Sequence, residues 1–214
     1  MTMRGSHLAA LALLLCASPA VADNPKKVAI GPGSPKGALL FTVPPLAVDY
    51  QLLFTPTDKK ASSSREYWVF VKAVPREKGE RFIVTSLPPG EYLLEGLYQQ
   101  RKWVACLQAK TMLISIEPGR IAYLGYLDAR PTLASIQRNA EASKELVAHY
   151  GDWHFYRTDV AAPRVSGRDD GGLARAEAFV RKHMPRSSAS PGLAGLRWLP
   201  YEIVGTTGGA NRCV

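Results

Sequence analysis

Eight short segments with the composition and spacing of β-strands occupy the middle of this 214-residue chain. They recur about every 8–12 residues and are separated by turn-forming pairs such as Pro89-Gly90 and Pro118-Gly119. The predicted strands are residues 38–43, 48–54, 66–74, 81–86, 91–98, 103–108, 112–117 and 120–127. This spacing is typical of all-β folds, so we expect a mainly β protein with a single antiparallel β-sandwich of about 7–8 strands over residues 38–130.

The pattern changes after residue 130, where apolar side chains recur at helical instead of strand spacing. The first predicted helix has its stripe at Ile136, Ala140, Ser143, Val147 and Tyr150 and ends at Gly151. A second begins after Asp169-Asp170 and stops at Pro185, with residues 185–197 as a linker and 198–204 as a last strand. We therefore expect residues 131–214 to form a helical and irregular C-terminal appendage.

The N-terminus has the three parts of a secretory signal peptide. Arg4 supplies the positive charge, residues 8–16 are wholly apolar, and Ala20-Val21-Ala22 offers small residues before a cleavage site. We expect residues 1–22 to be removed and residues 23–37, which are polar and rich in turns, to form a flexible lead-in. No later segment reaches 18 unbroken apolar residues, so no transmembrane segment is predicted.

Export predicts a periplasmic or secreted location, and Cys16 raises the alternative of a lipid anchor. A lipoprotein signal requires a small residue before its cysteine, whereas this chain has Leu15 there. We therefore expect release instead of anchoring. The oligomeric state stays open.

The chain is basic, with a formal net charge of +9, of which Arg4 leaves with the signal peptide. A dispersed positive charge favours anionic neighbours, so an anionic glycan or lipid surface or an envelope protein is the expected partner. The chain has no basic stripe with interleaved aromatic residues, so nucleic acid is not expected.

Two cysteines, Cys106 and Cys213, remain after loss of the signal peptide. In an oxidising compartment they predict a disulfide that ties the end of the chain to its middle, with two unpaired thiols as the alternative.

Candidate catalytic groups are sparse, and we expect no catalytic residues and no cofactor. His149, Asp152 and His154 form the richest polar cluster, and imidazole and carboxylate suit a metal ion such as zinc. The two histidines are not at the helical spacing of a metalloprotease, so this site is kept as the weaker alternative. No Gly-x-Ser-x-Gly motif is present to mark a serine hydrolase.

One hairpin tip offers a possible binding patch. Tyr98, Arg101, Lys102 and Trp103 surround the predicted turn between two strands. If they gather there, they form an exposed aromatic and basic surface suited to an anionic glycan or a partner protein.

Two motifs suggest a fold family. The segment Leu87-Pro88-Pro89-Gly90-Glu91-Tyr92 resembles the turn of prealbumin-like and carboxypeptidase regulatory-like sandwiches. Residues 116–125, with the turn Pro118-Gly119 followed by Tyr123-Leu124-Gly125, look like a second hallmark of small bacterial exported proteins with that sandwich. The resemblance covers residues 38–127 and implies an envelope module that binds or supports a structure without catalysis.

Three functions follow as hypotheses. The first is a non-enzymatic, exported binding or structural module of the cell envelope. The second is a metal-dependent or hydrolytic enzyme centred on His149, Asp152 and His154. The third is a subunit of an envelope assembly, completed at an open strand edge by another chain.

Overall fold

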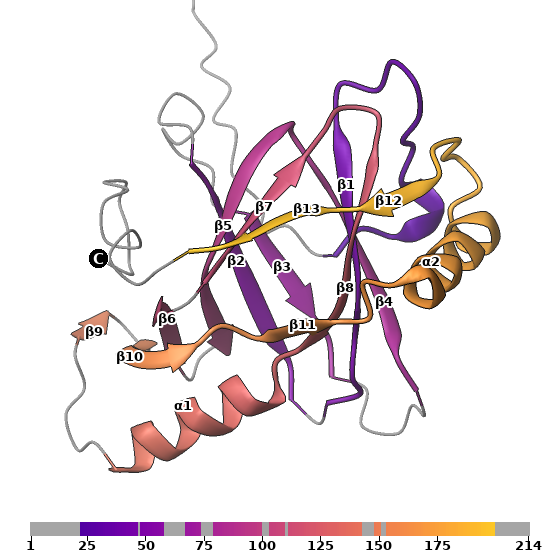
Figure 1. Ribbon diagram of the computed structural model, residues 1–214. Coiled ribbons are helices and arrows are strands. Elements are labelled where there is room, and N and C mark those ends of the chain that lie inside the picture. Colours follow the sequence, from indigo (N-terminus) through magenta and orange to yellow (C-terminus); the bar gives the residue numbers. More distant parts are fainter. Residues whose placement is uncertain are drawn as a thin grey trace, which may run out of the picture.

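The computed structural model describes residues 22–46, 48–57, 67–73, 79–99, 103–109, 111–142, 148–150 and 153–199. Within these ranges the protein is mainly β, with thirteen strands in two sheets and two α-helices (Figure 1). The mainly β class predicted from the sequence is thereby confirmed.

The five-stranded sheet has β1 at its centre. Its strands are β1 (Gly37–Val43), β4 (Arg81–Leu87), β8 (Ile121–Asp128), β11 (Arg164–Ser166) and β12 (Pro191–Leu193). The order is β11-β8-β1-β4, and β12 also pairs with β8. β1 runs antiparallel to β4 but parallel to β8.

The eight-stranded sheet has β5 (Gly90–Gln99) at its centre. Its other strands are β2 (Tyr50–Pro56), β3 (Tyr67–Val71), β6 (Trp103–Ala109), β7 (Met112–Ile116), β9 (Ala148–Tyr150), β10 (Trp153–Ala161) and β13 (Gly195–Trp198). β2 pairs with one side of β5, while β7 and β6 share the other side. β10 lies parallel to β6, and β13 antiparallel to β7.

The sequence prediction of a purely antiparallel fold is wrong, because three strand pairs are parallel. The eight strands predicted between residues 38 and 127 all occur, with boundaries displaced by a few residues at most. Parallel pairing joins strands that are distant in the sequence, so the local strand pattern carries no sign of it.

The two sheets share one hydrophobic core. Alternate residues of β1, Leu39, Phe41 and Val43, point into it. Tyr50, Leu52, Phe54, Leu94, Leu97 and Ile114 of the eight-stranded sheet belong to the same cluster. Burial of this many large apolar side chains is the main stabilising contribution to such a fold.

A second hydrophobic cluster covers the opposite face of the five-stranded sheet. There α2 (Asp170–His183) lies over the sheet (Figure 1), and its Ala176 and Val180 belong to the same buried cluster as Leu40 and Tyr123. Every residue of β1 is buried because the strand lies between two apolar layers.

The segment before β1 is not the flexible lead-in expected from its composition. A 3₁₀-helix, η1 (Pro25–Lys27), is followed by Val28 and Ile30, which are buried in the second cluster. Asp23 lies along the outer edge of β4, where its amide donates to the Val84 carbonyl (2.9 Å) and its carboxylate accepts from the Ser86 amide (2.6 Å). The two bonds satisfy backbone groups of β4 that point away from β1 and would otherwise lie at an open edge of the sheet.

The C-terminal part is not a helical appendage beside the sheets but completes both of them. The chain passes from β10 in the eight-stranded sheet to β11 in the other, and later from β12 back to β13. Figure 1 shows these two crossings, in orange and yellow, over the same side of the molecule. We call residues 191–198 the closing strap, because Ala194 at its middle is buried in the shared core.

Arg168 fixes the closing strap to β8. Its guanidinium donates from one nitrogen to the Leu124 carbonyl (3.1 Å) and from another to the Ala194 carbonyl (2.6 Å). Burial lowers the pKa of this guanidinium. Beside it, Gly125 has φ 106°, and a Cβ there would lie 2.4 Å from the Ser166 carbonyl oxygen, so β8 and β11 approach closely only because this residue is glycine.

The first helix differs from its prediction. α1 (Arg130–Ala142) begins and ends earlier than the periodicity predicts, and it packs against β10. The strands β9 and β10 then occupy residues that were assigned to the helix and to irregular structure. The second predicted helix is confirmed as α2. None of the helices in the described ranges is both long and apolar enough to cross a bilayer.

Candidate functional site

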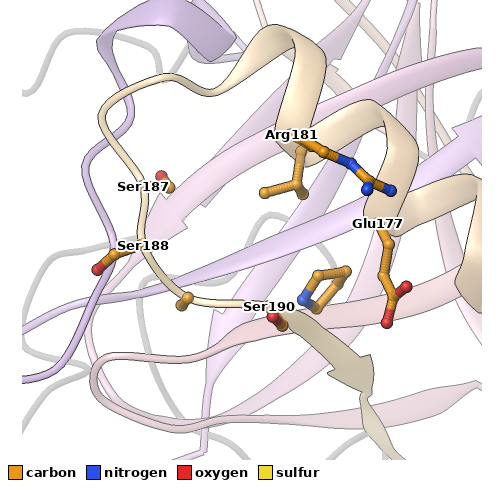
Figure 2. Close-up of a pocket in the computed structure, with 8 residues that line it drawn as sticks. Glu177, Arg181, Ser187, Ser188 and Ser190 are labelled. Atoms are coloured by element: carbon orange, nitrogen blue, oxygen red, sulfur yellow. The ribbon is translucent and has the colours of Figure 1, made fainter.

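A surface groove of about 370 Å³ lies between the second half of α2 and the segment that follows it (Figure 2). The helix contributes Glu177, Val180 and Arg181. The opposite wall is formed by Ser187, Ser188, Ala189, Ser190 and Pro191.

The helix wall of the groove is set by capping and amphipathicity. Asp169 is the N-cap of α2, and its side chain accepts from the Gly172 amide at 2.8 Å. The apolar stripe fixes the rotation of the helix, with Val180 against the sheet and only 6% exposed. Glu177 and Arg181, four residues apart, therefore share the outward face.

The serine wall is held by the N-terminal segment. The Ser187 hydroxyl donates to the Val28 carbonyl (3.0 Å) and accepts from the Ile30 amide (3.2 Å). The amides of Ser188 and Ala189 both donate to the Ile30 carbonyl. Since residues 28–30 are themselves anchored in the second cluster, this loop has a fixed course despite its linker-like composition.

Cations are frequent on the segments that carry and hold the groove, and one of them, Arg181, lines it. Five exposed basic residues, which we call the basic rim, come from η1 and from the end of α2 with its following loop: Lys26, Lys27, Arg181, Lys182 and Arg186. The bonds between Ser187 and residues 28–30 bring these two segments together. Residues 24–30 and 177–191 contain one carboxylate, that of Glu177. The local field of these segments is therefore positive.

The groove does not assemble a hydrolytic site. The Ser187 hydroxyl is engaged with backbone groups, and the nearby His183 ring stacks on Phe179 at a centroid distance of 5.0 Å. A serine nucleophile needs a base in contact with its hydroxyl, and no such contact occurs among the described groove residues. The groove presents hydrogen-bond donors, acceptors and charge, which suit binding.

The sequence-predicted metal site is placed only by its backbone. His149 on β9 and His154 on β10 are directly opposite each other in the antiparallel pair, although the helix expected there is absent. Asp152 lies outside the described residues. Within the described ranges no group of three or more histidine, cysteine, aspartate or glutamate side chains could hold a metal ion. The metal-dependent alternative stays a prediction.

The predicted disulfide also reaches beyond the described residues. Cys106 lies on β6, opposite Gly96 of β5 and Arg157 of β10. Cys213 lies outside the described ranges, so the pairing of Cys106 with Cys213 stays a prediction.

The predicted aromatic and basic patch needs a correction at Tyr98. This side chain is 1% exposed, so it is part of the interior and not of a surface patch. Trp103 begins β6, and its backbone pairs with Gln99. Arg101 and Lys102 lie outside the described residues.

A buried carboxylate was missed by sequence reasoning. Glu95 is 2% exposed and accepts a hydrogen bond from the Thr55 hydroxyl. It sits at a bulge in β5, where the partner of Leu53 is Gly96 but the partner of Phe54 is Leu94. The alternation of side chains along a strand predicts which face of the sheet residue 95 occupies, but it cannot reveal a bulge that changes this assignment.

The groove was also missed, because its loop wall is held in place by residues 28–30, from the other end of the chain. The serine run at 187–190 beside Arg186 was a visible signal, but its composition predicts a linker. Nothing in the local sequence pairs that loop with residues 28–30.

Comparison of the chain with protein-family models, with curated protein sequences and with solved structures finds no match in any of the three.

Proposed function

We propose that this protein is an exported, non-catalytic binding module of the cell envelope, and that the basic rim is the face that meets an anionic envelope component. The observation that carries this proposal is that two segments joined by hydrogen bonds, residues 24–30 and 177–191, carry five exposed cations and a single carboxylate. An anionic polymer would gain from several of these charges at once.

The proposal includes a prealbumin-like β-sandwich as the scaffold. Its support is the turn before β5, where Gly90 has φ 151° and the buried Tyr92 donates its hydroxyl to the Pro88 carbonyl at 2.8 Å. Burial raises the pKa of Tyr92, so this phenol stays protonated and remains a donor. These are the residues on which the family resemblance depends.

The test is binding of the chain from residue 23 onward to immobilised polygalacturonate, an anionic polysaccharide. A quadruple variant, Lys26→Gln, Lys27→Gln, Lys182→Gln and Arg186→Gln, removes most of the rim. The control removes four exposed cations elsewhere: Lys72→Gln, Arg138→Gln, Arg164→Gln and Arg197→Gln.

We expect the rim variant to bind about tenfold more weakly or worse and the control to bind nearly as the wild type does, with affinity falling as salt screens the charges. Equal losses in both variants would show that dispersed charge, and not this face, makes the contact. Absence of wild-type binding at low salt would overturn the proposal.

A further inference from the structure

We propose that the groove is a subsite for one acidic sugar unit, a pyranose that carries a carboxylate or a phosphate ester. This inference rests on the proposed function and names the ligand chemistry of that face. Four features of the groove support it: the unpaired cation Arg181, the Ser190 hydroxyl, the Glu177 carboxylate and a small apolar surface.

Arg181 supplies the anion contact. It is exposed at the helix wall, and no carboxylate of the described residues lies within 4.0 Å of its guanidinium. Figure 2 shows its side chain and that of Glu177 extending separately from α2. A planar guanidinium matches the two oxygens of a carboxylate or phosphate and binds them more strongly than a neutral donor does.

The hydroxyl of Ser190 supplies a contact that can donate or accept. This residue is exposed on the loop wall (Figure 2), whereas the Ser188 side chain lies against Gly31 and points away from the helix wall. Glu177 adds a pure acceptor on the opposite wall. Each sugar hydroxyl can both donate and accept a hydrogen bond, so a sugar can satisfy this set of groups. A simple anion, in contrast, would place like charge against the Glu177 carboxylate and would be repelled by it.

The floor is apolar. Val180 is 6% exposed, Pro191 is buried and Ala189 is half-buried. Most of this apolar surface is covered by protein, so Ala189 is the residue that can contact the C–H face of a pyranose while the polar substituents of the sugar reach the walls. At about 370 Å³ the groove lies at the small end of ligand sites, which limits the subsite to one or two sugar units of a longer chain.

The test is isothermal titration and NMR titration of the chain from residue 23 onward with digalacturonate. The probes for comparison are lactose, a neutral disaccharide, and inorganic phosphate. We expect digalacturonate to bind, with chemical-shift changes centred on residues 177–191, and lactose and phosphate to bind at least about tenfold more weakly, because each offers only part of the recognised chemistry.

Variants separate the contacts. Arg181→Gln should reduce the affinity for digalacturonate about tenfold or more and bring it close to that for lactose. The variant Ser190→Ala should weaken the binding of both sugars and leave phosphate binding unchanged. Arg138→Gln, an exposed arginine on α1, is the matched control and should change nothing. All these side chains are exposed, and circular dichroism checks that each variant folds.

Two outcomes would overturn this inference while the proposed function stands. One is polygalacturonate binding that depends on the four cations of the rim variant but not on Arg181 or Ser190. The other is phosphate binding as tight as digalacturonate binding. Failure of the wild type to bind polygalacturonate overturns the proposed function instead. Binding of digalacturonate away from residues 177–191 would also reject the groove.

Discussion

Asp128 connects the end of β8 to the start of α1. One carboxylate oxygen accepts from the Arg130 amide (3.0 Å) and from its Nε (2.8 Å), and the other accepts from its terminal nitrogen at 2.7 Å. The hydrogen bonds from Arg130 hold the pKa of Asp128 below its ordinary value. A single carboxylate thus satisfies a free amide at the helix start and pairs with a cation.

Asp128→Asn should lower the free energy of unfolding at pH 7 by about 0.5–1 kcal/mol. The effect stays small because the Arg130 side chain is 54% exposed and its charge is screened by water. The folded pKa is depressed, so this stabilisation is complete above the unfolded pKa, near 3.8, and is lost as the pH falls through the folded value.

Urea unfolding of wild type and variant at pH 7 and at successively lower pH measures this difference. The two curves should converge in acid. Asp170→Asn is the control, since Asp169 and not Asp170 caps α2. A constant difference at every pH would contradict the role assigned to the carboxylate charge.

At the scale of elements, Arg168 joins three pieces of the chain. It precedes α2, and it binds the Leu124 carbonyl on β8 and the Ala194 carbonyl in the closing strap. Hydrogen bonds from a charged donor contribute more than neutral ones, and their loss leaves two carbonyls without this donor.

Arg168→Gln should therefore lower the free energy of unfolding by about 2 kcal/mol. Cleavage by a protease in the closing strap should also become faster, because the strap is released locally. Arg138→Gln, in contrast, should leave both measurements unchanged. If the strap stays as protected as in the wild type, Arg168 does not hold it.

The elements that sequence reasoning found are those with strong local signals. The eight strands between residues 37 and 128 alternate or are flanked by Pro-Gly turns, and Asp169 marks the start of α2. The strands β9, β11 and β12 have three residues each, which is too short for a periodic pattern. β9 was also missed because Val147 and Tyr150 continue the helical spacing of Ile136 and Ala140 by coincidence.

At the scale of the molecule, the core is closed by residues from the C-terminal part of the chain. Ala194 is 3% exposed in the shared cluster, whereas Gly192, two residues earlier on β12, is exposed with open space around the position of a Cβ. The loop wall of the groove also depends on distant residues, because its course is set by hydrogen bonds to Val28 and Ile30, and the local sequence gives no sign of those bonds.

A pair of matched variants in the closing strap tests this closure. Ala194→Asp places an unpaired charge in the core and should destabilise the protein by about 4 kcal/mol or more, or prevent folding. Gly192→Asp changes the net charge equally but stays in water, so its unfolding midpoint should remain near that of the wild type. Similar midpoints for the two variants would show that the strap does not seal the core.

The pairing of β8 with both β1 and β12 also sets the order in which the protein can form. β1 begins at Gly37, and β12 begins at Pro191, so about three quarters of the chain separates strands that lie one strand apart. Contacts between distant residues slow folding. A growing chain cannot cover this part of its core before residues 191–198 have emerged, so the final packing around Ala194 forms only when synthesis is nearly complete.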